Sequence, residues 1–132
     1  MKIDRQEMIS VYVALNEWLS INHEKRIDSY RIRADSIANE IGKLRGVNYS
    51  YSQEKDYIEG LSMELDPTIV KISPKQISDQ LKSGNPSIWI RMGGPDNKQV
   101  NEHSIAVRVS TLSEGDEILI AHKIKQILLE NL

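Results

Sequence analysis

The spacing of the apolar residues changes near residue 47, and this change limits the chain to a fold with a helical part and a strand-rich part. Up to residue 46 the apolar residues recur every three or four positions, which is typical of helices with one buried face. From Val47 onward, short alternating stretches indicate strands, with helical stretches between them. The pattern predicts a helical segment over 1–46 and a small α+β domain over 47–132, a mostly antiparallel sheet covered by helices.

Two helices are predicted before the sheet. Asp4 followed by Glu7 forms a capping box at the start of the first helix, and Asn22 can cap the second. Gly42 and Gly46 could both end the second helix, and Gly46 fits the apolar spacing better. The first helix carries one apolar stripe, formed by Met8, Tyr12, Leu15 and Leu19.

The middle of the chain predicts three strands and a short helix. The strands are expected over Val47–Ser52, over Tyr57–Glu64 and over the β-branched stretch Thr68–Ile72. The run Ser73–Gln76 contains a capping serine, a proline suited to the first helical position and a glutamine that completes a capping box. It therefore predicts a helix, which Gly84 ends.

The last third predicts a hairpin and a closing helix. Strands are expected over Ser87–Met92 and His103–Leu112, with a turn formed by Gly93–Asn97 between them. Ser113 is the predicted cap of the final helix, whose first turn is rich in acidic residues.

Composition limits the classes of function. The 132 residues have a formal net charge of −2 with no long basic run, which argues against a nucleic-acid or membrane-surface partner. No apolar stretch approaches the roughly 20 residues that span a bilayer. There is no cysteine, which excludes disulfides and cysteine nucleophiles, and no signal-peptide pattern. These features predict a cytoplasmic protein.

The residues show no motif for catalysis or metal binding. His23, His103 and His122 are scattered without metal-ligand spacing, so no metal site is predicted. None of the ten lysines lies in a recognisable nucleophile motif. Lys71 interrupts an apolar stretch, and we expect it on the solvent face of its strand. No catalytic residue is assigned.

One candidate binding residue remains. Arg91 follows an apolar stretch that contains Trp89, at the end of a predicted strand. A guanidinium in this position can bind a carboxylate through two parallel hydrogen bonds, or can simply reach water at the sheet edge. The Trp89 ring is expected in the core or in an interface.

Several short motifs along the chain are informative through their order and spacing. They are Met1–Glu7, Asp66–Ile69, Ser73–Leu81, Gly84–Arg91, Thr111–Glu117 and Ile124–Leu128. In these motifs the chain resembles the C-terminal small domain of fold-type I pyridoxal-phosphate enzymes, in particular the L-seryl-tRNA(Sec) selenium transferase-like group, which includes sugar-acid-phosphate ammonia lyases. The segment 1–46 resembles the connection between the two domains of such enzymes.

The resemblance implies a division of labour with a part of the enzyme that is not in this chain. In the family, the Schiff-base lysine, the phosphate-binding turn and the aspartate that pairs with the pyridine nitrogen all lie upstream of the region that matches Met1. We therefore expect a C-terminal fragment that is inactive alone and binds no cofactor itself, with pyridoxal phosphate held by a large domain as its partner. Arg91 falls where small domains of this kind present an arginine to the substrate carboxylate.

Two alternatives remain open. The chain could be a stand-alone interaction or oligomerisation module that keeps the small-domain fold, with its helical stripes pairing with a partner or a second copy. Direct tRNA binding is suggested only by the selenium transferase name. The charge balance argues against it, because affinity for nucleic acid depends largely on cationic contacts.

Overall fold

The computed structural model describes residues 4–54, 56–92 and 101–132. In this part of the chain it contains four α-helices, four strands and one 3₁₀ helix. In chain order they are α1 (Arg5–Ser20), α2 (His23–Ile41), β1 (Val47–Glu54), β2 (Tyr57–Leu65), α3 (Pro74–Ser83), β3 (Arg91–Met92), β4 (Ser104–Arg108), η1 (Val109–Thr111) and α4 (Asp116–Glu130). The predicted α+β class, with two helices before the sheet, is confirmed.

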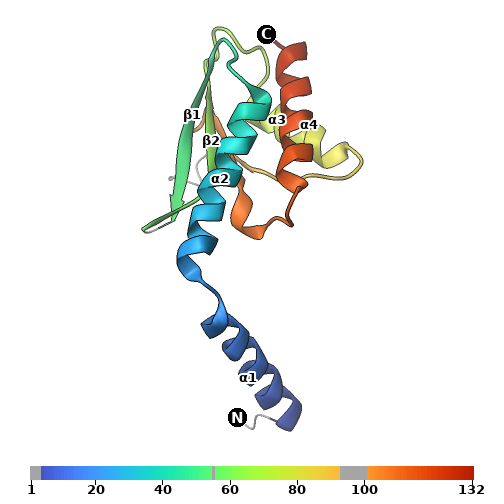
Figure 1. Ribbon diagram of the computed structural model, residues 1–132. Helices are drawn as coiled ribbons and strands as arrows, with labels where there is room; N and C mark the ends of the chain where they lie inside the picture. Colours follow the sequence, from blue (N-terminus) through green and yellow to red (C-terminus); the bar gives the residue numbers. More distant parts are fainter. Residues whose placement is uncertain (1–3, 55, 93–100) are drawn as a thin grey trace.

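The four strands form one antiparallel sheet in the order β1-β2-β4-β3. Helices α2 and α4 pack side by side against one face of this sheet (Figure 1). Tyr49 lies on that face, where its hydroxyl donates to the carbonyl of Gly42, the residue directly after α2, 2.5 Å away. The core lies between the helices and the sheet. It includes Ile37, Ile41, Met63, Ile105, Ile124 and Leu128.

The helix boundaries follow the capping residues closely. The capping boxes of Asp4 with Glu7 and of Ser73 with Gln76 both form, and the Asn22 side chain accepts the Lys25 N–H. The predicted stop at Gly46 is wrong. Helix α2 ends at Ile41, because the next residue is a glycine that takes a positive φ of 81° and turns the chain.

The predicted strand over Thr68–Ile72 does not form. The Asp66 carboxylate accepts both the N–H and the hydroxyl of Thr68, which turns the chain directly after β2. Val70 and Ile72 are buried in the core but belong to none of the strands that the structure describes. The β-branched residues of this stretch thus reflect burial, and Lys71 is exposed as expected but in a loop.

The hairpin strands are shorter than predicted. The chain joins the sheet only at Arg91, because the Ile88 N–H donates to the Leu81 carbonyl at the end of α3 instead of to a strand. Strand β4 gives way to η1 after Arg108. The antiparallel pairing of β3 with β4 is as predicted, whereas the turn expected at Gly93–Asn97 lies outside the described residues.

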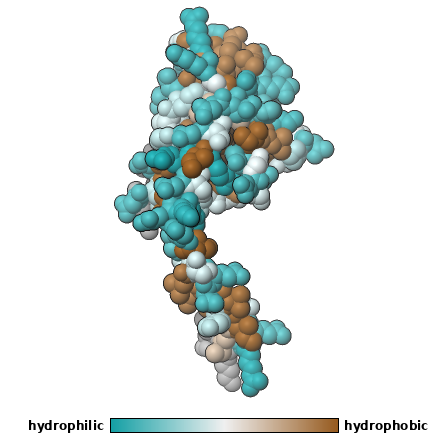
Figure 2. All heavy atoms as spheres, viewed as in Figure 1, coloured by the Kyte–Doolittle hydropathy of each residue, from teal (hydrophilic) through white to brown (hydrophobic). Residues whose placement is uncertain are grey.

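Helix α1 projects away from the body of the molecule (Figure 1). The predicted stripe is present, but none of the side chains described in this helix is buried. Figure 2 shows apolar side chains gathered along it. The large apolar residues of α1 that are exposed are Met8, Ile9, Val11, Tyr12, Val13, Leu15, Trp18 and Leu19.

A partly buried arginine joins α2 to the start of α4. The Arg33 guanidinium donates to the carbonyl oxygens of Val109, Leu112 and Ser113 and to Glu117 Oε2, at 2.9 to 3.2 Å. The Glu117 carboxylate also accepts the Gly115 N–H. The predicted Ser113 cap is wrong, because Gly115 is the N-cap and Glu117 binds the free N–H group there.

Gly60 is required by the close approach of β2 to β4. A Cβ atom added to Gly60 would lie 1.9 Å from the Val107 carbonyl oxygen. We expect Gly60→Ala to lower the free energy of unfolding by at least about 2 kcal/mol, because one of the two strands must move. Gly84→Ala is the control, since its nearest atom is 3.5 Å away. Equal urea midpoints for the two variants would contradict this prediction.

The Arg33–Glu117 contact makes stability depend on pH. Burial raises the pKa of the Glu117 carboxyl, but hydrogen bonds from Arg33 and from backbone N–H groups outweigh burial and hold this pKa below its usual 4.5. A lowered pKa adds stability above pH 4.5 that is lost as the pH falls through the folded-state value.

We therefore expect Glu117→Gln to destabilise the protein by about 2 kcal/mol at neutral pH and to flatten the loss of stability in acid. Urea unfolding at several pH values measures both effects. Glu114→Gln, at an exposed glutamate, is the control and should leave the pH profile as in the unaltered chain. An unchanged acid profile in Glu117→Gln would disprove the assignment.

Candidate functional site

A β-bulge in β2 turns Glu59 into the protein. In the pairing with β1, Ser52 lies opposite Gly60 and Gln53 lies opposite Ile58, so Glu59 is the extra residue. Bulges re-aim side chains and are common beside functional sites. The Glu59 residue is only 4% exposed, which is unusual for a carboxylate unless cations accompany it.

Two arginines meet the Glu59 carboxylate. Arg108 Nε lies 2.7 Å from Oε2, and Arg91 Nη1 lies 3.6 Å from Oε1. Arg108 is at the end of β4 opposite Gly60, and Arg91 is in β3 opposite Ala106. Directly paired residues share a sheet face, so both arginines lie on the face opposite to α2 and α4. We call this the arginine face.

Both arginines line a cleft of about 200 Å³ at the end of β3 and β4, which also reaches Ile120 of α4 on the helical side of the sheet. Its walls combine the two guanidinium groups with apolar side chains. The lining residues are Trp89, Ile90, Arg91, Val107, Arg108, Thr111, Leu112 and Ile120. The Arg91 side chain is 42% exposed, so its donors can reach a ligand in this cleft. A guanidinium in this setting can bind a carboxylate or another oxyanion.

The sequence pointed to Arg91 but not to its partners. Glu59 was hidden because a lone acidic residue in a strand pattern normally faces water. Gly60 beside it was the available signal, since a glycine inside a strand often marks a bulge or a close backbone approach. Arg108 was read only as an alternating polar position in its strand.

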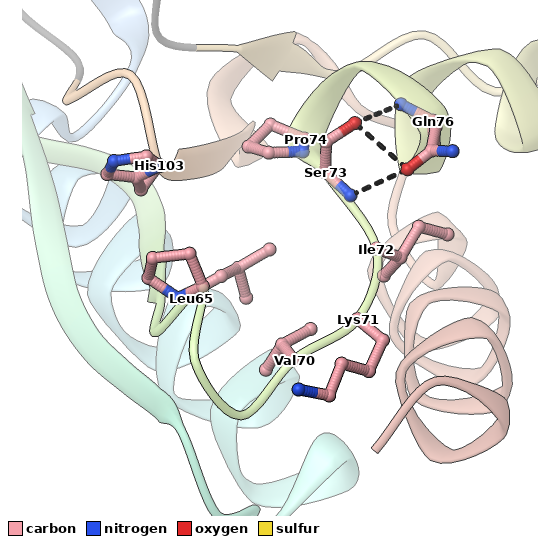
Figure 3. A pocket seen from close by; sticks show the side chains of 9 residues that line it. Leu65, Val70, Lys71, Ile72, Ser73, Pro74, Gln76 and His103 are labelled. Atoms are coloured by element: carbon pink, nitrogen blue, oxygen red, sulfur yellow. Dashed lines mark hydrogen bonds between the residues drawn. The ribbon is translucent and has the colours of Figure 1, made fainter.

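A second hollow of about 390 Å³ lies at the start of α3 (Figure 3). Its polar groups largely bind one another. Ser73 and Gln76 exchange hydrogen bonds, and Lys71 Nζ donates to the Thr68 carbonyl. His103 lies on the other side of the hollow. We do not place the site here, because these groups are already engaged within the loop and helix cap.

The remaining candidates are not brought to the arginine face. His122 contacts Glu40 on the helical side, with 2.7 Å between Nε2 and Oε1. Across the described ranges no three histidine, aspartate or glutamate residues meet as metal ligands would. Trp89 is not in the core: the residue is 77% exposed, and its ring centroid lies 4.4 Å from Lys82 Nζ.

Comparisons with known proteins relate the chain to larger enzymes. The structure of D-glucosaminate-6-phosphate ammonia-lyase matches 99% of this chain and 34% of its own, with a TM-score of 0.68 and 17% sequence identity. The 5'-C-glycyluridine monooxygenase-decarboxylase of a Streptomyces species is 20% identical over 133 residues, which cover 99% of this chain and 32% of that protein. No family model matches the chain.

The chain thus has the fold of part of an ammonia-lyase and spans about a third of the length of both proteins. This supports the expected relationship to a domain of a larger enzyme. It gives no support to the selenium transferase group in particular.

Among the described helices, none combines the length and apolar character needed to cross a membrane.

The two arginines should differ in their effect on stability. We expect Arg108→Ala to lower the free energy of unfolding by about 3 kcal/mol, because it removes the nearest cation from a buried carboxylate. Arg91→Ala should cost less than about 1 kcal/mol, because Arg91 is partly exposed and its contact is longer. Urea unfolding measures both variants, and an equal loss in the two would show that Glu59 depends on them equally.

Proposed function

We propose that the chain is a small domain of a pyridoxal-phosphate-dependent enzyme and that Arg91 binds the carboxylate of its substrate. The observation that carries the proposal is the half-exposed Arg91 guanidinium, which borders a cleft and contacts the buried Glu59. The side chain is 42% exposed and its contact with Glu59 runs through Nη1 at 3.6 Å, so a carboxylate can approach the other donors of the guanidinium.

The match to the ammonia-lyase supports the enzyme class, together with the motif resemblance described above. We favour ammonia-lyase chemistry on a sugar-acid phosphate over selenium transfer. A tRNA substrate would call for a concentration of cations, which a net charge of −2 does not supply. The partner is then the large domain that holds the cofactor, in the same polypeptide or another one.

The chemistry divides between the two domains. Bound pyridoxal phosphate supplies the electron sink for the reaction. This chain supplies orientation: Arg91 fixes the substrate carboxylate, and the apolar cleft wall beside it limits access of water. None of the lysines of the chain matches a Schiff-base motif, so the chain alone should be inactive.

The exposed α1 helix favours a second role as an interaction or oligomerisation module, since a helix with this much apolar surface normally has a partner. Such a module would have no use for an anion site on the arginine face. Carboxylate binding that depends on Arg91 therefore distinguishes the two functions.

The test is an NMR titration of the ¹⁵N-labelled chain with sodium D-gluconate, a sugar acid, at constant ionic strength. We expect the arginine Nε–Hε signal of Arg91 to shift saturably in the millimolar range, because one ion pair on an open cleft binds weakly. Glucose, which lacks the carboxylate, should shift nothing.

Two variants test whether gluconate binds at Arg91. Arg91→Ala should abolish saturable binding, read from the backbone signals of β3 and β4. The control Arg45→Ala, at an exposed arginine far from this cleft in the fold, should bind as the unaltered chain does. Absence of a saturable shift, or its survival in Arg91→Ala, would refute the proposed role.

A further inference from the structure

We infer that Trp89 is a specificity-determining residue of the Arg91 site and that its indole ring stacks against the carbon chain of a carboxylate bound there. The site then favours long hydroxy acids over short ones. The inference rests on the proposed function, because it concerns the same cleft. It assigns a role to a tryptophan that is 77% exposed and that the proposed function does not use.

Trp89 and Arg91 lie on the same side of the segment that leads into β3. Burial alternates along this segment. Ile88 lies in the core and Ile90 packs against it. Trp89 and Arg91 are both exposed. This alternation is that of an extended chain, in which residues two positions apart point to the same side, and both side chains line the cleft of about 200 Å³.

Hydrogen bonds to the end of α3 orient the exposed ring. Trp89 Nε1 donates to Ser87 Oγ over 3.2 Å, and the Ser87 hydroxyl donates to the Lys82 carbonyl over 2.6 Å. Lys82 Nζ also lies 4.4 Å from the ring centroid, in a cation–π contact. The ring is thus held before a ligand arrives, which reduces the conformational entropy that is lost on binding.

The space beside the ring admits a chain longer than the carboxylate itself. A second hollow of about 250 Å³ adjoins the cleft and shares three lining residues with it, Trp89, Leu112 and Ile120. Its wall includes the Asp116 carboxylate, which can accept hydrogen bonds from hydroxyl groups. A ligand held at Arg91 can therefore extend along Trp89, with the C–H groups of its chain against the ring.

The experiment compares two α-hydroxy acids, glycolate, which has no further carbon chain, and D-gluconate, which has a long polyhydroxy chain. Both are titrated at equal ionic strength into the ¹⁵N-labelled chain. Binding is followed at the Arg91 Nε–Hε signal and at the indole N–H signal of Trp89. The chain has only two tryptophans, so Trp89→Leu assigns this signal.

We expect gluconate to bind at least about threefold more tightly than glycolate, because contact with an aromatic ring adds to the ion pair. Only gluconate should shift the Trp89 indole signal, with the dissociation constant found at Arg91. Trp89→Leu should bind both acids as weakly as glycolate, since leucine has no ring face. Trp89→Phe, which keeps an aromatic ring, should retain most of the preference.

The control is Trp18→Leu, at the other exposed tryptophan, which lies in α1 and should leave the ratio of the two affinities unchanged. The backbone spectrum verifies that each variant is folded. If Trp89→Leu does not fold, the affinity ratio of the unaltered chain and that of Trp89→Phe decide.

The two acids separate this inference from the proposed function. Equal affinities at Arg91, or a preference for gluconate that survives in Trp89→Leu, would overturn the role of Trp89 and leave the carboxylate site at Arg91 intact. Absence of saturable binding by both acids would overturn the proposed function, and the inference with it.

Discussion

The close approach of β2 to β4 at Gly60 is the constraint on which the site depends. The strands can lie this near only where a side chain is absent, because the Val107 carbonyl oxygen lies 1.9 Å from the place that a Cβ atom would take. This contact sets Arg108 opposite Gly60. The bulge one residue earlier then directs Glu59 to the arginine. The close approach of the two backbones therefore determines that Glu59 contacts Arg108.

Two buried carboxylates are held by arginines, and they serve different parts of the molecule. Glu117 and Arg33 join α2 to the loop before α4, and Arg33 also satisfies three backbone carbonyls there. This contact lies within the helical layer and holds it together. Glu59 lies on the opposite side of the sheet, where one of its two arginines remains partly exposed. The Arg33 guanidinium is thus engaged by groups within the helical layer, whereas the Arg91 guanidinium beside Glu59 stays partly exposed to solvent.

Structure that depends on neighbouring residues, such as helix caps, could be predicted from the sequence. Structure that depends on contacts between distant segments could not. The capping box at Ser73 needs only neighbouring residues, and it forms as expected. The stretch Thr68–Ile72 has strand composition but turns instead, because burial and strand pairing favour the same residue types. Arg91 could be singled out by its place at a strand end. Glu59 could not, since its burial depends on a bulge defined by another strand.

The stability of helix α1 depends on whether another surface covers its apolar side chains. A helix of 16 residues in which none of the described side chains is buried is marginal in water, whatever the quality of its capping box. Its apolar side chains gain their free energy only when another surface covers them. A surface that covered these side chains would therefore stabilise the helix itself as well as the contact between the two surfaces.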